Sequence, residues 1–172
     1  VAELFLEKGH SVVGIDRQAS AIDSEDYTHY VCDVRDWASF PEIDDVDILI
    51  NNAGTQNEDD IDINLKSLIK ITEKYGVRKG IKSVLNIGSA SGHTGSEFPE
   101  YCASKGGVIA YTKNVALRVA QYGAVCNSLD LIEFMRDEED GLSFSSQSLH
   151  DLHQLVNLLR SQHGSRFIEN EH

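Results

Sequence analysis

The feature that most constrains this chain is an alternation of short, β-branched apolar runs with longer segments of helical periodicity. The runs have the length and composition of buried strands, and they cover residues 11–16, 28–33, 46–51, 83–88 and 123–128. The intervening segments with apolar residues at helical spacing are 1–8, 61–75 and 101–122. Strands that alternate with helices are typical of βαβ units. We therefore predict an α/β fold with a three-layer, Rossmann-like, doubly wound parallel sheet.

The charge and cysteine content limit the classes of function. The chain has 15 Lys and Arg against 28 Asp and Glu, a formal net charge of −13, which argues against a nucleic-acid partner and against an anionic membrane surface. No apolar run approaches the ~20 residues that span a bilayer. Cys32, Cys102 and Cys126 are widely spaced and form no C-x-x-C pair. Together with the lack of a recognisable signal peptide, this predicts a cytoplasmic protein without disulfides.

The sequence changes character near residue 130. Residues 1–130 carry the α/β pattern, whereas residues 131–172 form an acidic, Ser-rich tail with one helix candidate at 149–159. His150 and His153 lie three apart in that candidate helix. A helical His pair can bind a metal when further ligands converge on it. No Cys accompanies the pair, so we expect no metal site.

Tyr101 and Lys105 are the first candidates for chemistry. Side chains at positions i and i+4 of a helix lie on one face, roughly 5–6 Å apart at Cβ. A free phenol ionises near pH ~10 and transfers protons poorly at neutral pH. An ammonium on the same helix face favours the phenolate and suits the pair to general acid–base catalysis. The spacing alone also occurs by chance on helices that have no catalytic function.

Further polar residues follow the predicted strands, at the edge where doubly wound sheets bind ligands. Ser89 follows residues 83–88, Asn51-Asn52-Ala53-Gly54 ends another strand, and Asp16 ends residues 11–16. Each also has an ordinary structural interpretation, as a loop hydroxyl, a turn or a solvated carboxylate. In a nucleotide-binding sheet, Asp16 would accept hydrogen bonds from the adenosine ribose and repel a 2′-phosphate. Its neighbour Arg17 would instead favour the phosphorylated cofactor.

Taken together, residues 1–130 resemble the short-chain dehydrogenase/reductase family, and within it the 3-oxoacyl-acyl-carrier-protein-reductase-like members. The features that carry the resemblance occur in the family's order, and they are Asp16, Asp33-Val34, Asn51-Asn52-Ala53-Gly54, Asn64, Ser89 in Asn86-Ile87-Gly88-Ser89, and Tyr101-x-x-x-Lys105.

The resemblance implies a catalytic role for four residues. Tyr101 would protonate a carbonyl oxygen during reduction or deprotonate an alcohol during oxidation. Lys105 would hold the nicotinamide ribose and favour the phenolate of Tyr101. Ser89 would bind the substrate oxygen, and Asn64 would anchor a water in the proton path.

The same resemblance implies a cofactor site. Asp33 and Val34 would contact the adenine, and Ala53 and Gly54 would pass beneath the adenosine. Asp16, Asn51, Tyr101 and Lys105 complete the implied cofactor-binding set. The cofactor is expected to be NAD, with NADP as the alternative that Arg17 keeps open.

Three features depart from the family's pattern. The glycine-rich turn T-G-x-x-x-G-x-G would precede Val1, and only nine residues separate Gly54 from Asn64. The tail has no recognisable P-G motif, substrate lid or last strand. This pattern predicts a sheet that is incomplete at both ends, in a chain shortened at its N-terminus and divergent or frame-shifted after about residue 130.

The sequence therefore predicts an NAD(P)-dependent oxidoreductase that interconverts a carbonyl and a secondary alcohol of a small-molecule substrate. The resemblance further implies a homo-oligomer for the complete protein. The alternative is a catalytically impaired fragment, or a non-catalytic dinucleotide-sensing or interaction protein derived from such a reductase.

Overall fold

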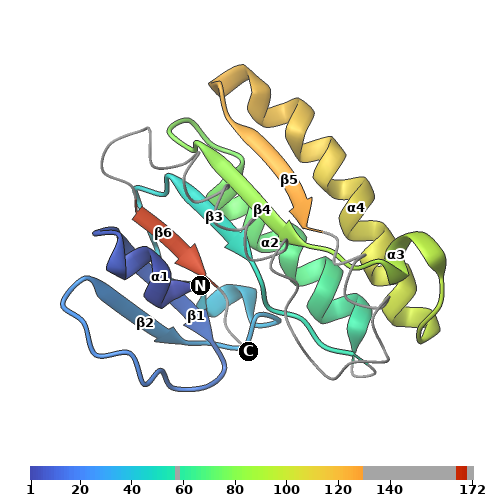
Figure 1. Ribbon diagram of the computed structural model, residues 1–172, viewed down its shortest axis with the longest axis horizontal. Helices are drawn as coiled ribbons and strands as arrows, with labels where there is room; N and C mark the ends of the chain where they lie inside the picture. Colours follow the sequence, from blue (N-terminus) through green and yellow to red (C-terminus); the bar gives the residue numbers. More distant parts are fainter. Residues whose placement is uncertain (57–58, 130–165, 170–172) are drawn as a thin grey trace, which may run out of the picture.

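The computed structural model describes residues 1–56 and 59–129, together with the backbone of residues 166–169. Its centre is a six-stranded sheet in the order β2-β1-β6-β3-β4-β5, in which every neighbouring pair is parallel (Figure 1). The strands are β1 (Ser11–Asp16), β2 (Tyr27–Val31), β3 (Ile48–Asn51), β4 (Ser83–Ile87), β5 (Val125–Leu129) and β6 (Arg166–Glu169). The predicted α/β class and parallel sheet are confirmed.

Helices lie on both faces of the sheet, which makes three layers. Helix α1 (Ala2–Glu7) packs its Phe5 with Val12 and Ile50 in one apolar cluster. On the opposite face, Leu49 packs with Ile71 and with Val115 of helix α4 (Pro99–Val119) in a second cluster. Neighbours in a strand point to opposite faces, so Leu49 and Ile50 enter different clusters. This explains why β3 reads as a continuous apolar run.

The shorter elements connect these layers. Helix α3 (Ser91–Thr94) precedes α4, which continues into the 3₁₀ turn η4 (Ala120–Tyr122), and a second 3₁₀ turn, η1, covers Trp37–Ser39. The segment predicted as one helix at 61–75 consists of π-helical η2 (Ile61–Ser67), α2 (Leu68–Ile71) and π-helical η3 (Thr72–Gly76). The Ser67 hydroxyl donates to the Asp62 carbonyl five residues earlier, at 2.8 Å. An apolar pattern read over so few turns does not distinguish i→i+5 from i→i+4 bonding, so the sequence did not indicate the wider turns.

Strand β6 corrects the expectation that the tail contains no strand. It lies between β1 and β3, with the Cα of Val12 opposite that of Phe167 and the Cα of Ile48 opposite the same residue. The last of the described strands thus joins the two halves of the sheet (Figure 1). The predicted tail helix at 149–159, with His150 and His153, lies outside the described residues.

The described segments also bear on membrane association. Within residues 1–56 and 59–129, no helix combines the length and the apolar character that crossing a bilayer requires.

Candidate active site

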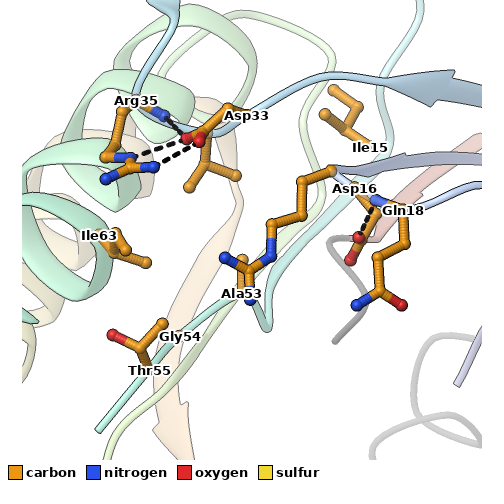
Figure 2. Close-up of a pocket in the computed structure, with 11 residues that line it drawn as sticks. Ile15, Asp16, Gln18, Asp33, Arg35, Ala53, Gly54, Thr55 and Ile63 are labelled. Carbon is orange, nitrogen blue, oxygen red and sulfur yellow. Dashed lines mark hydrogen bonds and ion pairs between the residues drawn. The ribbon is translucent and has the colours of Figure 1, made fainter. Parts of the chain in front are cut away.

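A pocket of about 110 Å³ lies at the carboxyl ends of β1, β2 and β3 (Figure 2). That volume is far more than one water needs. Five of the predicted cofactor-binding residues line it, and they are Asp16, Asp33, Val34, Ala53 and Gly54. The remaining lining residues are Ile15, Arg17, Gln18, Arg35, Thr55 and Ile63. Parallel strands place their carboxyl ends at one edge of a sheet, which is why residues far apart in sequence meet here.

Asp33 is held at this pocket by Arg35. The Nη2 and Nε atoms of Arg35 donate to the two carboxylate oxygens of Asp33, at 2.6 and 3.0 Å, and the Arg35 backbone N–H donates at 2.9 Å. These hydrogen bonds from Arg35 lower the pKa of Asp33 to about 2, and the charge of Arg17 adds to the effect. Arg35 also reaches Asp59 at 2.8 Å, so it connects the segment after β2 with the segment after β3.

Asp16 ends β1 and is buried, with 7% of its surface exposed. Its backbone carbonyl accepts from the amide of Cys32 at 2.8 Å. Its Oδ1 accepts from the amide of Gln18 at 2.7 Å, which closes a tight turn at the pocket (Figure 2). A side-chain carboxylate that bonds an amide two residues on is a common way to shape such a turn.

Asn51 lies outside the pocket lining, within β3. Its Nδ2 donates to Thr72 Oγ1 and to Asn86 Oδ1, both at 2.8 Å, and Asn86 Nδ2 donates to Thr112 Oγ1 at 2.9 Å. This buried network connects β3 and β4 to η3 and α4. Among the described residues, Asn51 Oδ1 has no hydrogen-bond partner. The geometry thus gives Asn51 a structural task, and the predicted cofactor contact stays a prediction.

Asn64 lies in η2 and clamps the segment after β3. Its Oδ1 accepts from the Thr55 amide at 2.7 Å, and its Nδ2 donates to the Thr55 carbonyl at 2.8 Å. The same Nδ2 lies 3.2 Å from Ser104 Oγ, which in turn donates to the Tyr101 carbonyl at 2.7 Å. A chain of hydrogen bonds therefore joins the loop beside the pocket to the helix that carries Tyr101.

Lys105 is buried, with only 5% of its surface exposed. Its Nζ donates to the carbonyl of Ile87 at 2.9 Å and lies 5.7 Å from the centre of the Tyr101 ring. A buried ammonium is costly unless it has polar partners, and the end of β4 supplies one. The structure thus confirms that Tyr101 and Lys105 share a helix face and adds a tie from Lys105 to β4.

Two glycines allow helices to approach this site closely. A Cβ on Gly92 of α3 would lie 2.7 Å from the carbonyl carbon of Lys105, and one on Gly107 would lie 2.6 Å from Leu65 Cδ2. Gly54 is also close to the site, since a Cβ there would lie 3.1 Å from Asn64 Oδ1. Larger residues would move α3 and η2 away from α4.

Ser89 lies between β4 and α3, two residues after the carbonyl that binds Lys105. Its hydroxyl lies 3.3 Å from Ser91 Oγ and accepts from the Ser91 amide at 3.2 Å. The structure therefore places Ser89 on the same sheet edge as the end of β4, beside the helix pair α3 and α4.

The site also contains residues that the sequence did not single out. Arg35, Thr55 and Ser104 each hold a predicted site residue by hydrogen bonds. The charge pattern of Arg35, two residues after Asp33, was a usable signal. Thr55 acts through its backbone and Ser104 through a contact across 40 residues, so neither has a local signature.

Curated proteins give a consistent set of relatives. The 3-oxoacyl-(acyl-carrier-protein) reductase FabG of Haemophilus influenzae is 32% identical over 118 residues, which cover 55% of this chain and 49% of that protein. FabG of Vibrio harveyi is 27% identical over 183 residues, covering 85% of this chain and 75% of that protein. The D-beta-hydroxybutyrate dehydrogenase of Rhizobium meliloti is 36% identical, covering 48% and 38%. The chain spans about half the length of several such relatives.

Solved structures share the fold. A 4-hydroxyisoleucine dehydrogenase complexed with NADH and succinate superposes with a TM-score of 0.64 at 22% identity, covering 98% of this chain and 90% of that one. A closed form of serine dehydrogenase complexed with NADP⁺ gives the same TM-score and identity, covering 75% and 64%.

A comparison with protein families identifies the family of this chain. Residues 1–131 match the short chain dehydrogenase family, and this is well over half of the chain. The protein therefore belongs to the short-chain dehydrogenase/reductase family.

Proposed function

We propose that this chain forms the dinucleotide-binding and catalytic part of an NAD(P)(H)-dependent oxidoreductase that interconverts a carbonyl and a secondary alcohol. The observation that carries the proposal is the pair Tyr101 and Lys105, with a buried ammonium 5.7 Å from the phenol ring and anchored at 2.9 Å to the end of β4. A charge buried beside a phenol is costly for stability and useful for proton transfer.

The residues at the sheet edge fit the adenosine half of a dinucleotide. The pocket offers an apolar wall from Ile15, Val34 and Ile63 for a purine ring. The carboxylate of Asp16 is an acceptor for ribose hydroxyls, and the backbone at Ala53 and Gly54 allows a flat ligand to approach. We propose that Asp33 meets the adenine, although Arg35 already bonds both of its oxygens.

The reacting end uses different groups. When bound, the nicotinamide supplies or accepts the hydride. Tyr101 Oη gives its proton to the carbonyl oxygen in reduction and takes it from the alcohol in oxidation. Lys105 holds the nicotinamide ribose and favours the phenolate, and Ser89 donates to the substrate oxygen. Asn64 keeps the Thr55 segment in place beside the water path that the family resemblance implies.

The cofactor preference follows from the charges around Asp16. A carboxylate gains hydrogen bonds from an unmodified ribose but repels a 2′-phosphate, and such a like-charge contact costs several kcal/mol. An exposed Arg17 recovers less than that. We therefore propose NAD(H) over NADP(H). Replacement of Asp16 by Ser should weaken NADH binding and relax the discrimination.

The direct test uses the chain extended to the length of its relatives: a calorimetric titration with NADH and NADPH, followed by turnover assays on a panel of carbonyls and alcohols. For the 172-residue chain alone we expect neither strong binding nor appreciable activity. The panel includes 3-oxoacyl thioesters and 3-hydroxybutyrate, because the named relatives act on such compounds. For the extended protein we expect NADH binding and turnover, with Tyr101→Phe keeping its fold but reacting about 10²–10⁴-fold more slowly. Equal rates in the two proteins would remove Tyr101 from the mechanism, and binding without turnover would favour a non-catalytic sensor.

We also propose a homo-oligomer for the complete protein. Light scattering of a chain extended to the length of its relatives measures this, and a monomer at micromolar concentration would contradict it.

A further inference from the structure

A short chain of hydrogen bonds runs from β2 to the turn that follows β1. The hydroxyl of Tyr27 lies 2.9 Å from Nδ1 of His29, and Nε2 of His29 lies 2.8 Å from the backbone carbonyl of Gln18. Tyr27 and His29 are two apart in β2, so their side chains lie on one face of the sheet. The chain therefore ends at the turn that carries Asp16.

The backbone carbonyl of Gln18 fixes which groups donate and which accept in this series of hydrogen bonds. Gln18 O can only accept, so the proton of a neutral His29 ring lies on Nε2. Nδ1 is then an acceptor, and the Tyr27 hydroxyl must donate to it. Each member thus selects the state of the next: Tyr27 favours the tautomer in which His29 donates to Gln18.

The neighbouring strand β1 leaves room for the side chains of Tyr27 and His29 at Gly14. The strand register places the Cα of Gly14 opposite that of His29, and the Cα of Val12 opposite that of Tyr27. A Cβ on Gly14 would overlap the Tyr27 hydroxyl and lie 3.1 Å from His29 Nδ1. A glycine here therefore lets both side chains lie flat over β1.

The hydrogen bond from His29 ends on a segment that has no regular secondary structure. Residues 17–26 form neither helix nor strand. The backbone of Asp16 is anchored by the Cys32 amide. His29 anchors Gln18, the other end of the turn, whose amide bonds the Asp16 carboxylate at 2.7 Å. The direction of that carboxylate therefore depends on where Gln18 is held.

We propose that His29 is a positioning residue for cofactor selection: it fixes the Asp16–Gln18 turn so that the Asp16 carboxylate faces the ribose 2′ position. This rests on the proposed function and extends it from Asp16 to a residue of the next strand. Without the bond from His29, the turn loosens, the carboxylate loses its direction, and Arg17 becomes free to meet a 2′-phosphate.

Two fragments of the cofactors test this at the adenosine pocket alone. Adenosine 5′-monophosphate carries a 2′-hydroxyl and adenosine 2′,5′-bisphosphate a 2′-phosphate, so the ratio of their Kd values measures selection at that position. The variants are His29→Phe, which keeps a ring but loses both hydrogen bonds, and His29→Gln, whose amide still donates to Gln18 O. Tyr30→Phe is the matched control, since Tyr30 lies in β2 but points to the other face.

The wild-type protein should favour the monophosphate. In His29→Phe we expect this preference to fall by about three- to tenfold, the effect of losing the bond to Gln18 O. His29→Gln should restore most of it, and Tyr30→Phe should keep all of it. Tyr27→Phe should lie between the wild type and His29→Phe. Thermal unfolding of each variant shows whether stability changes in parallel.

The outcomes separate this inference from the proposed function. An unchanged ratio in His29→Phe, or an equal loss of both affinities with a lower Tm, overturns the positioning role and leaves the proposed function standing. A changed ratio in a protein that binds NADH but shows no turnover supports the positioning role and overturns the proposed catalysis. A wild-type protein that binds neither fragment overturns both.

Discussion

The polar side chains at the two ends of the candidate site differ in their exposure to solvent. At the adenosine end, the ion pair of Arg35 and Asp33 is partly open to solvent, with 42% and 37% of the two side chains exposed. At the reacting end, Asn64, Ser104 and Lys105 are 1%, 0% and 5% exposed. Buried polar groups are costly to leave unpaired, whereas exposed pairs are screened and contribute little. The buried polar groups of the reacting end should therefore tolerate change far less than the Arg35–Asp33 pair of the adenosine end.

The largest expected effect follows from removal of the buried charge. Lys105→Met keeps the aliphatic stem but loses the ammonium that supports Tyr101, so turnover should fall by at least about 100-fold. Lys66→Met is the control, because Lys66 is 56% exposed on η2 and should keep full activity. Initial rates measured at saturating NADH check this. Similar losses in both variants would show that the contrast between the two ends is wrong.

The next effect concerns stability at the same end. Asn64→Ala removes the two hydrogen bonds that Asn64 makes with the amide and carbonyl of Thr55, which should lower the free energy of unfolding by about 1–3 kcal/mol. Denaturant melts measure it, with Asn114→Ala as the control, since Asn114 is an exposed acceptor for Arg118 on α4. A change in Asn64→Ala no larger than in the control would show that the clamp on Thr55 contributes nothing.

A smaller effect is expected at the adenosine end. Hydrogen bonds from Arg35 lower the pKa of Asp33 to about 2. Stabilisation from a lowered pKa is complete above the unfolded value of about 3.9 and is lost as the pH falls toward 2. Arg35→Met should therefore raise the pKa of Asp33 and flatten the loss of stability between about pH 4 and 2. Carboxyl NMR titration measures the pKa directly, and an unshifted Asp33 would contradict the assignment to Arg35.

The smallest effect belongs to a pair outside the site. Lys66 and Asp62 form an i,i+4 bridge at 2.6 Å, with 56% and 52% of their side chains exposed. Lys66→Gln should change the free energy of unfolding by no more than about 0.5 kcal/mol. A larger loss in the same denaturant melts would mean that exposure does not predict tolerance in this protein.

The sequence predicted the residues that meet at the pocket but did not predict the residues that hold them. The meeting of Asp16, Asp33 and Gly54 at one pocket was predictable, because each ends or follows a strand and parallel strands bring their carboxyl ends together. The partners of these residues were not. Asn64 of η2 bonds Thr55 across nine residues, and His29 reaches Gln18 across eleven, with Gly14 leaving space above β1. Such contacts depend on the path of the backbone over distances that residue spacing does not encode.

Local periodicity by itself determined five of the six described strands, the α/β class and the shared helix face of Tyr101 and Lys105, since these depend on the 2.0- and 3.6-residue repeats of neighbouring residues. The tertiary structure alone decided which strands are neighbours. Strand β6 pairs with β1 and β3 from the far end of the chain, and no local repeat specifies a partner that distant. It also decided which charges became buried, because burial of Lys105 requires α3, α4 and β4 to meet around it.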